Sequence, residues 1–101
     1  MNSSALNAII SKRDGATLDS TQINQFVRDV AQDHINDAQI AAFCMAGFIR
    51  GMSTHECTNL TRAMRDSGSQ LDWNDLDLDG PVVDKHSTGG IGDCVSLLLA
   101  P

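Results

Sequence analysis

Basic residues are scarce in this chain. Seven lysines and arginines stand against thirteen acidic residues, which gives a net charge of −6 at pH 7 and a pI near 4.6. Proteins that bind nucleic acid depend on clustered Lys and Arg to neutralise phosphates. Between Asp66 and Asp84 there are six aspartates and no basic residue at all. The composition therefore argues against a nucleic-acid partner, and the acidic stretch over 68–80 is interpreted as a solvated linker.

Long hydrophobic runs and paired cysteines are also missing. Residues 1–10 hold only a short apolar run with no basic segment before it, so neither a secretory signal nor a membrane span is predicted. Cys44, Cys57 and Cys94 form no CxxC pair and are odd in number, which favours free thiols in a reducing compartment. The histidines are scattered, so no metal site is predicted. A cytoplasmic location is the simplest expectation.

Helical periodicity, by contrast, fills the first two thirds of the chain. With 101 residues and 42% hydrophobic content, one modest core is possible. Apolar residues recur at i, i+3 and i+4 in four segments, each bounded by helix start and stop signals. The four helices are expected from Ser3 or Ser4 to a stop at Asp14–Gly15, from a capping box at Asp19, from Asn36 or Asp37, and from a capping box at Ser53 to Gly68. Residues 1–67 are therefore predicted to form a helical domain.

The pattern changes at residue 81. Val82 and Val83 predict a short strand over 81–86, residues 87–93 form a glycine-rich loop, and residues 94–100 would start a helix. A strand, a glycine loop and a helix form the opening of an α/β layer. The predicted fold is thus mainly α, with a helical domain followed by an acidic linker and the beginning of an α/β domain over 81–101.

A single parallel strand needs neighbouring strands to pair with. The chain is therefore expected to be the front of a longer protein. Unpaired strand edges also predict poor order or self-association from about residue 80 onward.

The glycine-rich loop is the strongest functional signal. Its glycines, Gly89, Gly90 and Gly92, allow several backbone N–H groups to point at one spot where a helix begins. The positive end of the helix dipole acts at the same spot, and such a spot binds anions, phosphate above all. A plain structural turn is the alternative interpretation.

Side chains around the loop fit an anion as well. Lys85 can add a full positive charge, and the hydroxyls of Ser87, Thr88 and Ser96 can donate hydrogen bonds to phosphate oxygens. His86 offers a proton donor or acceptor near neutral pH. These residues are the candidate phosphate-binding and catalytic groups.

Three better-known loops do not fit the sequence. There is no Walker A motif, and the third glycine of a dinucleotide fingerprint is missing after Gly92, so a bare phosphate or a phosphosugar is favoured over ATP or NAD. Residues 75–80 match the first half of an EF-hand loop. However, His86 stands at the twelfth position, where calcium needs a bidentate Glu.

Residues 82–101, VVDKHSTGGIGDCVSLLLAP, closely resemble the signature of the thymidine and pyrimidine nucleoside phosphorylases. KRDG at 12–15, DAQIAAFCMA at 37–46 and AMRDSG at 63–68 are similar to the N-terminal pieces of that family. The resemblance covers essentially the whole chain. Within the family, RDSG and the following LDW at 71–73 look more like the thymidine-specific members.

The resemblance implies a two-domain subunit that forms a homodimer through its helical domain, with the active site in the cleft between the domains. It implies that Lys85, Ser87 and Ser96 bind phosphate and that His86 faces the pyrimidine. Phosphate would attack the anomeric carbon of thymidine and give thymine and 2-deoxyribose 1-phosphate. No organic cofactor is implied. Cys94 stands where potassium-binding relatives often have Thr, so that ion is not carried over.

The family residues that grip the pyrimidine ring would lie beyond residue 101, so the chain alone is expected to be inactive. Two other functions stay open: a broader pyrimidine nucleoside phosphorylase, and a non-catalytic helical dimerisation module with an anion-binding tail. The anthranilate phosphoribosyltransferases have a similar helical domain and glycine loop but lack the Lys-His-Ser-Thr run.

Overall fold

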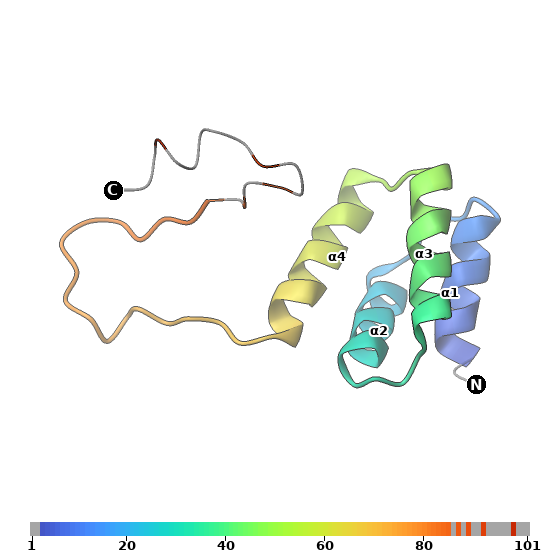
Figure 1. Ribbon diagram of the computed structural model, residues 1–101, viewed down its shortest axis with the longest axis horizontal. Coiled ribbons are helices and arrows are strands. Elements are labelled where there is room, and N and C mark those ends of the chain that lie inside the picture. Colours follow the sequence, from blue (N-terminus) through green and yellow to red (C-terminus); the bar gives the residue numbers. More distant parts are fainter. Residues whose placement is uncertain (1–2, 86, 88, 90–91, 93–97, 99–101) are drawn as a thin grey trace. The chain divides into compact units, whose positions relative to one another are not determined.

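The computed structural model describes residues 3–85 together with residues 87, 89, 92 and 98. It contains four helices, α1 (Ser3–Arg13), α2 (Ser20–Ala31), α3 (Asp37–Arg50) and α4 (Thr54–Ser67) (Figure 1). Each of the four expected helices is present, so the mainly helical fold is confirmed. The chain divides into two compact units, residues 1–70 and residues 71–101.

Helices α2, α3 and α4 each begin with a reciprocal capping box. At α2, Asp19 Oδ1 accepts from the Gln22 backbone N–H at 2.8 Å, and Gln22 Oε1 accepts from the Asp19 N–H at 3.1 Å. The same two-way bonding joins Asn36 to Gln39 and Ser53 to Glu56. These bonds satisfy N–H groups that a helix start otherwise leaves unpaired. The two capping boxes predicted from the sequence are confirmed, and Asn36 is the N-cap of α3.

The helices alternate in direction along the first unit. In Figure 1, α1 and α3 run one way and α2 and α4 run the other way. Helix α1 packs against both α2 and α3, and α2 packs against α4. Short connections over 14–19, 32–36 and 51–53 join them, as is usual for up-and-down helical bundles.

The core lies between α1, α2 and α3. The apolar side chains that are buried there are Ala5, Ala8, Leu18, Ile23, Phe26, Ile35 and Phe43. The small side chains at Ala5 and Ala8 allow α1 to approach its neighbours closely. The rings of Phe26 and Phe43 stack between α2 and α3, with their centroids 4.0 Å apart. Complete burial of a residue such as Ile23 contributes about 1.5 to 3 kcal/mol.

The expected strand over 81–86 is wrong for residues 81–85, which form neither strand nor helix. Val82 and Val83 are 55% and 82% exposed. A strand is held by hydrogen bonds to a neighbouring strand, and the described residues include no second strand that could supply them. Residue 86 and the expected helix start over 94–100, apart from Leu98, lie outside the described residues.

Candidate functional site

The predicted phosphate loop is described at half of its positions. Lys85, Ser87, Gly89 and Gly92 are placed, and each is exposed. The other predicted site residues, His86, Thr88, Gly90 and Ser96, lie outside the described residues. The roles assigned to all eight from the sequence stay predictions.

The described loop residues form a local turn. The backbone N–H of Gly89 donates to Ser87 Oγ at 3.3 Å, and the N–H of Gly92 donates to the Gly89 carbonyl at 3.2 Å. Gly89 and Gly92 have φ angles of +78° and +84°, which side chains other than glycine adopt only with strain. Both N–H groups are used within the loop in this conformation. To bind an anion with these two N–H groups, the loop would have to change its conformation so that both groups point at the anion.

Lys85 begins this turn. Its backbone N–H donates to Asp84 Oδ1 at 2.7 Å, and its side chain is exposed. A lysine ammonium on an exposed stem can reach an incoming anion as a point charge.

A second polar cluster, around Glu56, was not predicted from the sequence. Glu56 is the chain's only glutamate and is 1% exposed. Its two oxygens each accept from Lys12 Nζ at 3.0 Å. They also accept from the backbone N–H groups of Leu18 at 2.9 Å and Ser53 at 2.8 Å. The Glu56 cluster, Glu56 with Lys12, Leu18 and Ser53, thus joins α1, the α1–α2 connection and the start of α4.

The surroundings of Glu56 determine its charge. Burial of the carboxyl group raises its pKa, but the hydrogen bonds from Leu18, Ser53 and Lys12 and the charge of Lys12 outweigh this, and the pKa falls to about 2. A carboxylate with such a pKa is ionised at neutral pH and does not serve as a general acid or base there. The Glu56 cluster is therefore a buried, ionised group that joins three parts of the bundle.

The sequence contains a signal for this cluster. Lys12 suits the C-terminal dipole of α1, but it follows Ala5 and Ala8 at i+7 and i+4, on the buried face of the helix. A lysine on the buried face needs a partner of opposite charge. The single glutamate, at the first turn of α4, provides it.

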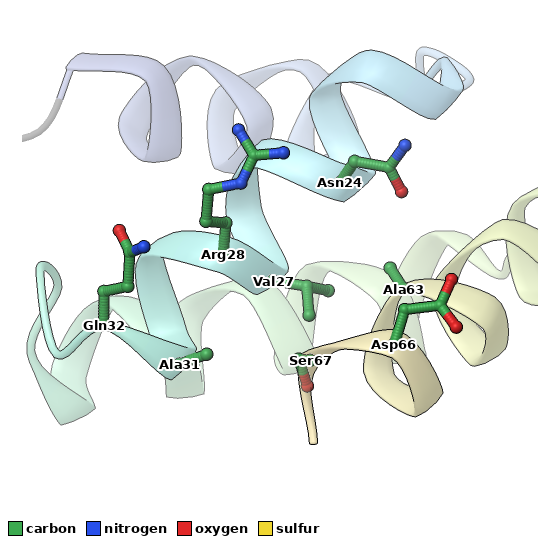
Figure 2. Close-up of a pocket in the computed structure, with 8 residues that line it drawn as sticks. All are labelled: Asn24, Val27, Arg28, Ala31, Gln32, Ala63, Asp66 and Ser67. Carbon is green, nitrogen blue, oxygen red and sulfur yellow. The ribbon is translucent and has the colours of Figure 1, made fainter. Parts of the chain in front are cut away.

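An open groove lies between the C-terminal halves of α2 and α4 (Figure 2). It has a volume of about 500 Å³ and mixes apolar with polar side chains. Its lining comprises Asn24, Val27, Arg28 and Ala31 of α2, the C-cap residue Gln32 that follows α2, and Ala63, Asp66 and Ser67 of α4. Arg28 Nη1 donates to Gln25 Oε1 at 3.4 Å. Asp66 Oδ1 accepts from Arg65 Nε at 2.8 Å, and this hydrogen bond lowers the pKa of Asp66.

Among the residues that line this groove, no nucleophile is paired with a base. In the described part of the chain, no group of three or more His, Cys, Asp or Glu side chains could hold a metal ion. None of the helices within that part is both long and apolar enough to cross a bilayer.

Comparison with known proteins shows which family and which relatives this chain is similar to. Residues 6–68 match the model of the glycosyl transferase family, helical bundle domain. The chain is 56% identical over 90 residues to a thymidine phosphorylase of Burkholderia cenocepacia, and 54% identical over 90 residues to the thymidine phosphorylases of Burkholderia orbicola and Sinorhizobium fredii. Each match covers 89% of this chain and 20% of the relative. The chain thus spans about a fifth of the length of these curated relatives.

Proposed function

The chain belongs to the glycosyl transferase family through its helical bundle domain, and from this premise we propose that it is part of a thymidine phosphorylase. In this proposal, the complete enzyme converts thymidine and inorganic phosphate reversibly to thymine and 2-deoxyribose 1-phosphate. The chain contributes the helical domain and the first residues of the phosphate site. Phosphate and thymidine are then the substrates.

One observation carries this proposal: the match to enzymes named thymidine phosphorylase extends beyond the helical domain. A continuous stretch of 90 residues in a chain of 101 must include residues 12–90 wherever it starts. It therefore includes the Lys-His-Ser-Thr run at 85–88. The family model, in comparison, ends at residue 68.

The proposed reaction needs the protein mainly to position phosphate and to stabilise its charge. Lys85, Ser87, Thr88 and Ser96 would hold phosphate with one ammonium group and three hydroxyls. Fixed donors around a doubly charged nucleophile, aimed at an electron-poor sugar carbon, accelerate a displacement by orientation and by electrostatic preorganisation. His86 would face the pyrimidine and assist its departure. The glycines at 89, 90 and 92 would let the backbone approach the anion.

The test of the phosphate site is calorimetric titration of the 101-residue chain with inorganic phosphate. We expect binding that weakens at least tenfold in Lys85→Ala, because the variant loses the only full positive charge among the proposed ligands. Asp84→Asn, which changes a neighbouring charge without removing a proposed ligand, is the matched control. Equal binding by Lys85→Ala and the unaltered chain would contradict the assignment.

The chain by itself is expected to be inactive, because the proposed pyrimidine-binding residues are not among its 101 residues. Measurable phosphorolysis of thymidine by the purified chain, followed by the release of thymine, would refute this expectation. In the complete enzyme, comparison of thymidine with uridine distinguishes the thymidine-specific function from that of a broader pyrimidine nucleoside phosphorylase.

A homodimer formed through the helical domain is also part of the proposal. Helix α3 exposes Met45, Phe48 and Ile49, which are 56%, 85% and 68% exposed. Apolar side chains gathered on one helix favour contact with a partner. Sedimentation of the chain should show a dimer that Phe48→Asp weakens.

This face also supports the second candidate function, a helical dimerisation module without catalysis. The bundle has its own core, and the module would dimerise without responding to phosphate. Dimerisation together with no phosphate response in calorimetry would favour the module over the enzyme.

A further inference from the structure

Helix α4 is held very differently at its two ends. Glu56, in its first turn, is its only buried residue. There the carboxylate accepts from Lys12, Leu18 and Ser53 within 3.0 Å. Farther along, Leu60 is partly buried and Met64 is 60% exposed. The start of α4 is thus fixed by buried hydrogen bonds, and its second half by partial apolar contact alone.

An apolar groove runs along that second half. It has a volume of about 300 Å³ and separates side chains of α4 from side chains of α2 and α3. Its walls include Phe26 and Val30 of α2, Ile40 and Phe43 of α3, and Leu60 and Met64 of α4. Figure 1 shows α4 diverging from α3 toward its C-terminal end. The apolar walls match one another in chemistry but leave space between them.

One polar atom on α4 is unsatisfied in this arrangement. Asn59 Nδ2 is buried without a hydrogen-bond partner, less than one turn after Glu56. A buried donor without a partner is unfavourable, so this part of α4 carries an energetic cost in the described arrangement. This atom lies between the fixed and the loosely packed parts of the helix.

We propose that α4 is a clamped arm that closes over the apolar groove. The Glu56 cluster is the pivot, and Leu60 and Met64 move in between the walls formed by α2 and α3. Residue 67 lies about 17 Å along the helix from residue 56, so a small rotation about the first turn displaces the far end most. Burial of apolar surface favours the closed position. Closure moves Ser67, where the helix ends. The inference does not depend on the proposed function.

Disulfide trapping tests the closure. Cys44, on α3, lines the groove, and a thiol introduced by Met64→Cys would face it from α4. The background carries Cys57→Ser and Cys94→Ser, so only the chosen pair can react. Because a disulfide needs Cα atoms within about 7 Å, closure should bring this pair into range. The matched control is Arg62→Cys, which places the second thiol about 200° around the same helix.

We expect the pair at 44 and 64 to cross-link within one chain at least ten times faster than the pair at 44 and 62. The oxidised form should also exchange the amide hydrogens of residues 61–67 at least tenfold more slowly than the reduced form. Equal cross-linking rates for the two pairs, or a cross-link that leaves exchange unchanged, would overturn the proposal.

Hydrogen exchange on the unaltered chain gives an independent test that does not rely on any variant. The amides of residues 57–60 should be protected at least tenfold more than those of residues 61–65. Uniform protection along α4 in the unaltered chain would contradict the clamped arm.

Discussion

The helical bundle and the segment that follows it obtain their conformations by different means. In the bundle, Leu18 and Ile23 are no more than 1% exposed, and hydrogen bonds such as that from Lys12 to Glu56 join residues 44 positions apart. Every residue from 71 to 85 is exposed, and the hydrogen bonds there, such as that from the Asn74 N–H to Asp72 Oδ1, are local. The difference teaches that the described members of the candidate site, Lys85, Ser87, Gly89 and Gly92, are exposed to solvent, whereas the bundle is held together by a buried core.

Removal of the buried charge at Glu56 should have the largest effect on this contrast. Glu56→Gln leaves Lys12 buried without a counter-charge, and we expect a loss of about 4 kcal/mol in the free energy of unfolding. Urea denaturation followed by circular dichroism measures it. Asp72→Asn, which removes one charge from the exposed segment, is the control and should change stability by less than about 0.5 kcal/mol.

The double variant Lys12→Met with Glu56→Met sharpens the interpretation. Replacing both partners of a buried ion pair with apolar side chains costs little or is even stabilising. We therefore expect it to be more stable than Glu56→Gln. A double variant as unstable as the single one would show that the backbone hydrogen bonds, and not the charge pair, dominate.

Truncation of a core side chain should cost somewhat less. Ile23→Ala removes a fully buried branched side chain and should destabilise the chain by about 3 kcal/mol. Val83→Ala makes a similar chemical change at a position that is 82% exposed, and it should have almost no effect. Equal urea midpoints for the two variants would break the contrast between the regions.

A fall in pH should lower the stability of the helical bundle, because Glu56 becomes protonated. Its pKa is about 2 in the folded chain and near 4.5 when unperturbed, so its contribution is complete above pH 4.5 and is lost as the pH falls toward 2. Between pH 6 and pH 3 the expected loss is about 2 kcal/mol. The double methionine variant lacks this group and serves as the reference. If its stability fell by the same amount over that range, other carboxylates would be responsible.

Loss of a helix cap should have the smallest effect. Asp19→Ala removes the side-chain acceptor for the Gln22 N–H at the start of α2 and should cost about 1 kcal/mol. Asp75→Ala, in the exposed segment, removes the same functional group and should cost almost nothing. Thermal unfolding of the two variants side by side gives the comparison.

The sequence predicts the helices well because the capping bonds that start them form between residues only three positions apart. Asp19 with Gln22 and Ser53 with Glu56 form the bonds that their spacing implies. Lys12 lies in the last turn of α1, where its charge suits the helix dipole, and the structure shows that it also forms a buried ion pair. Its partner lies 44 residues away, a distance that local spacing does not reveal.

The strand expected over 81–86 failed for a related reason. Val82 and Val83 have high β propensity, but propensity describes how a residue fits a sheet that already exists. The described residues supply no neighbouring strand. The candidate site residues stay predictions from the sequence, and of these the structure describes Lys85, Ser87, Gly89 and Gly92, each of which is exposed.

The capping boxes of α2, α3 and α4 also bear on how fast the bundle forms. Each box fixes where a helix begins through residues only three positions apart. A nascent helix therefore has a defined first turn before it meets any other helix, which lowers the entropic cost of its nucleation. Helical chains dominated by such short-range contacts fold in microseconds to milliseconds. Folding of residues 3–67 is thus expected to be rapid.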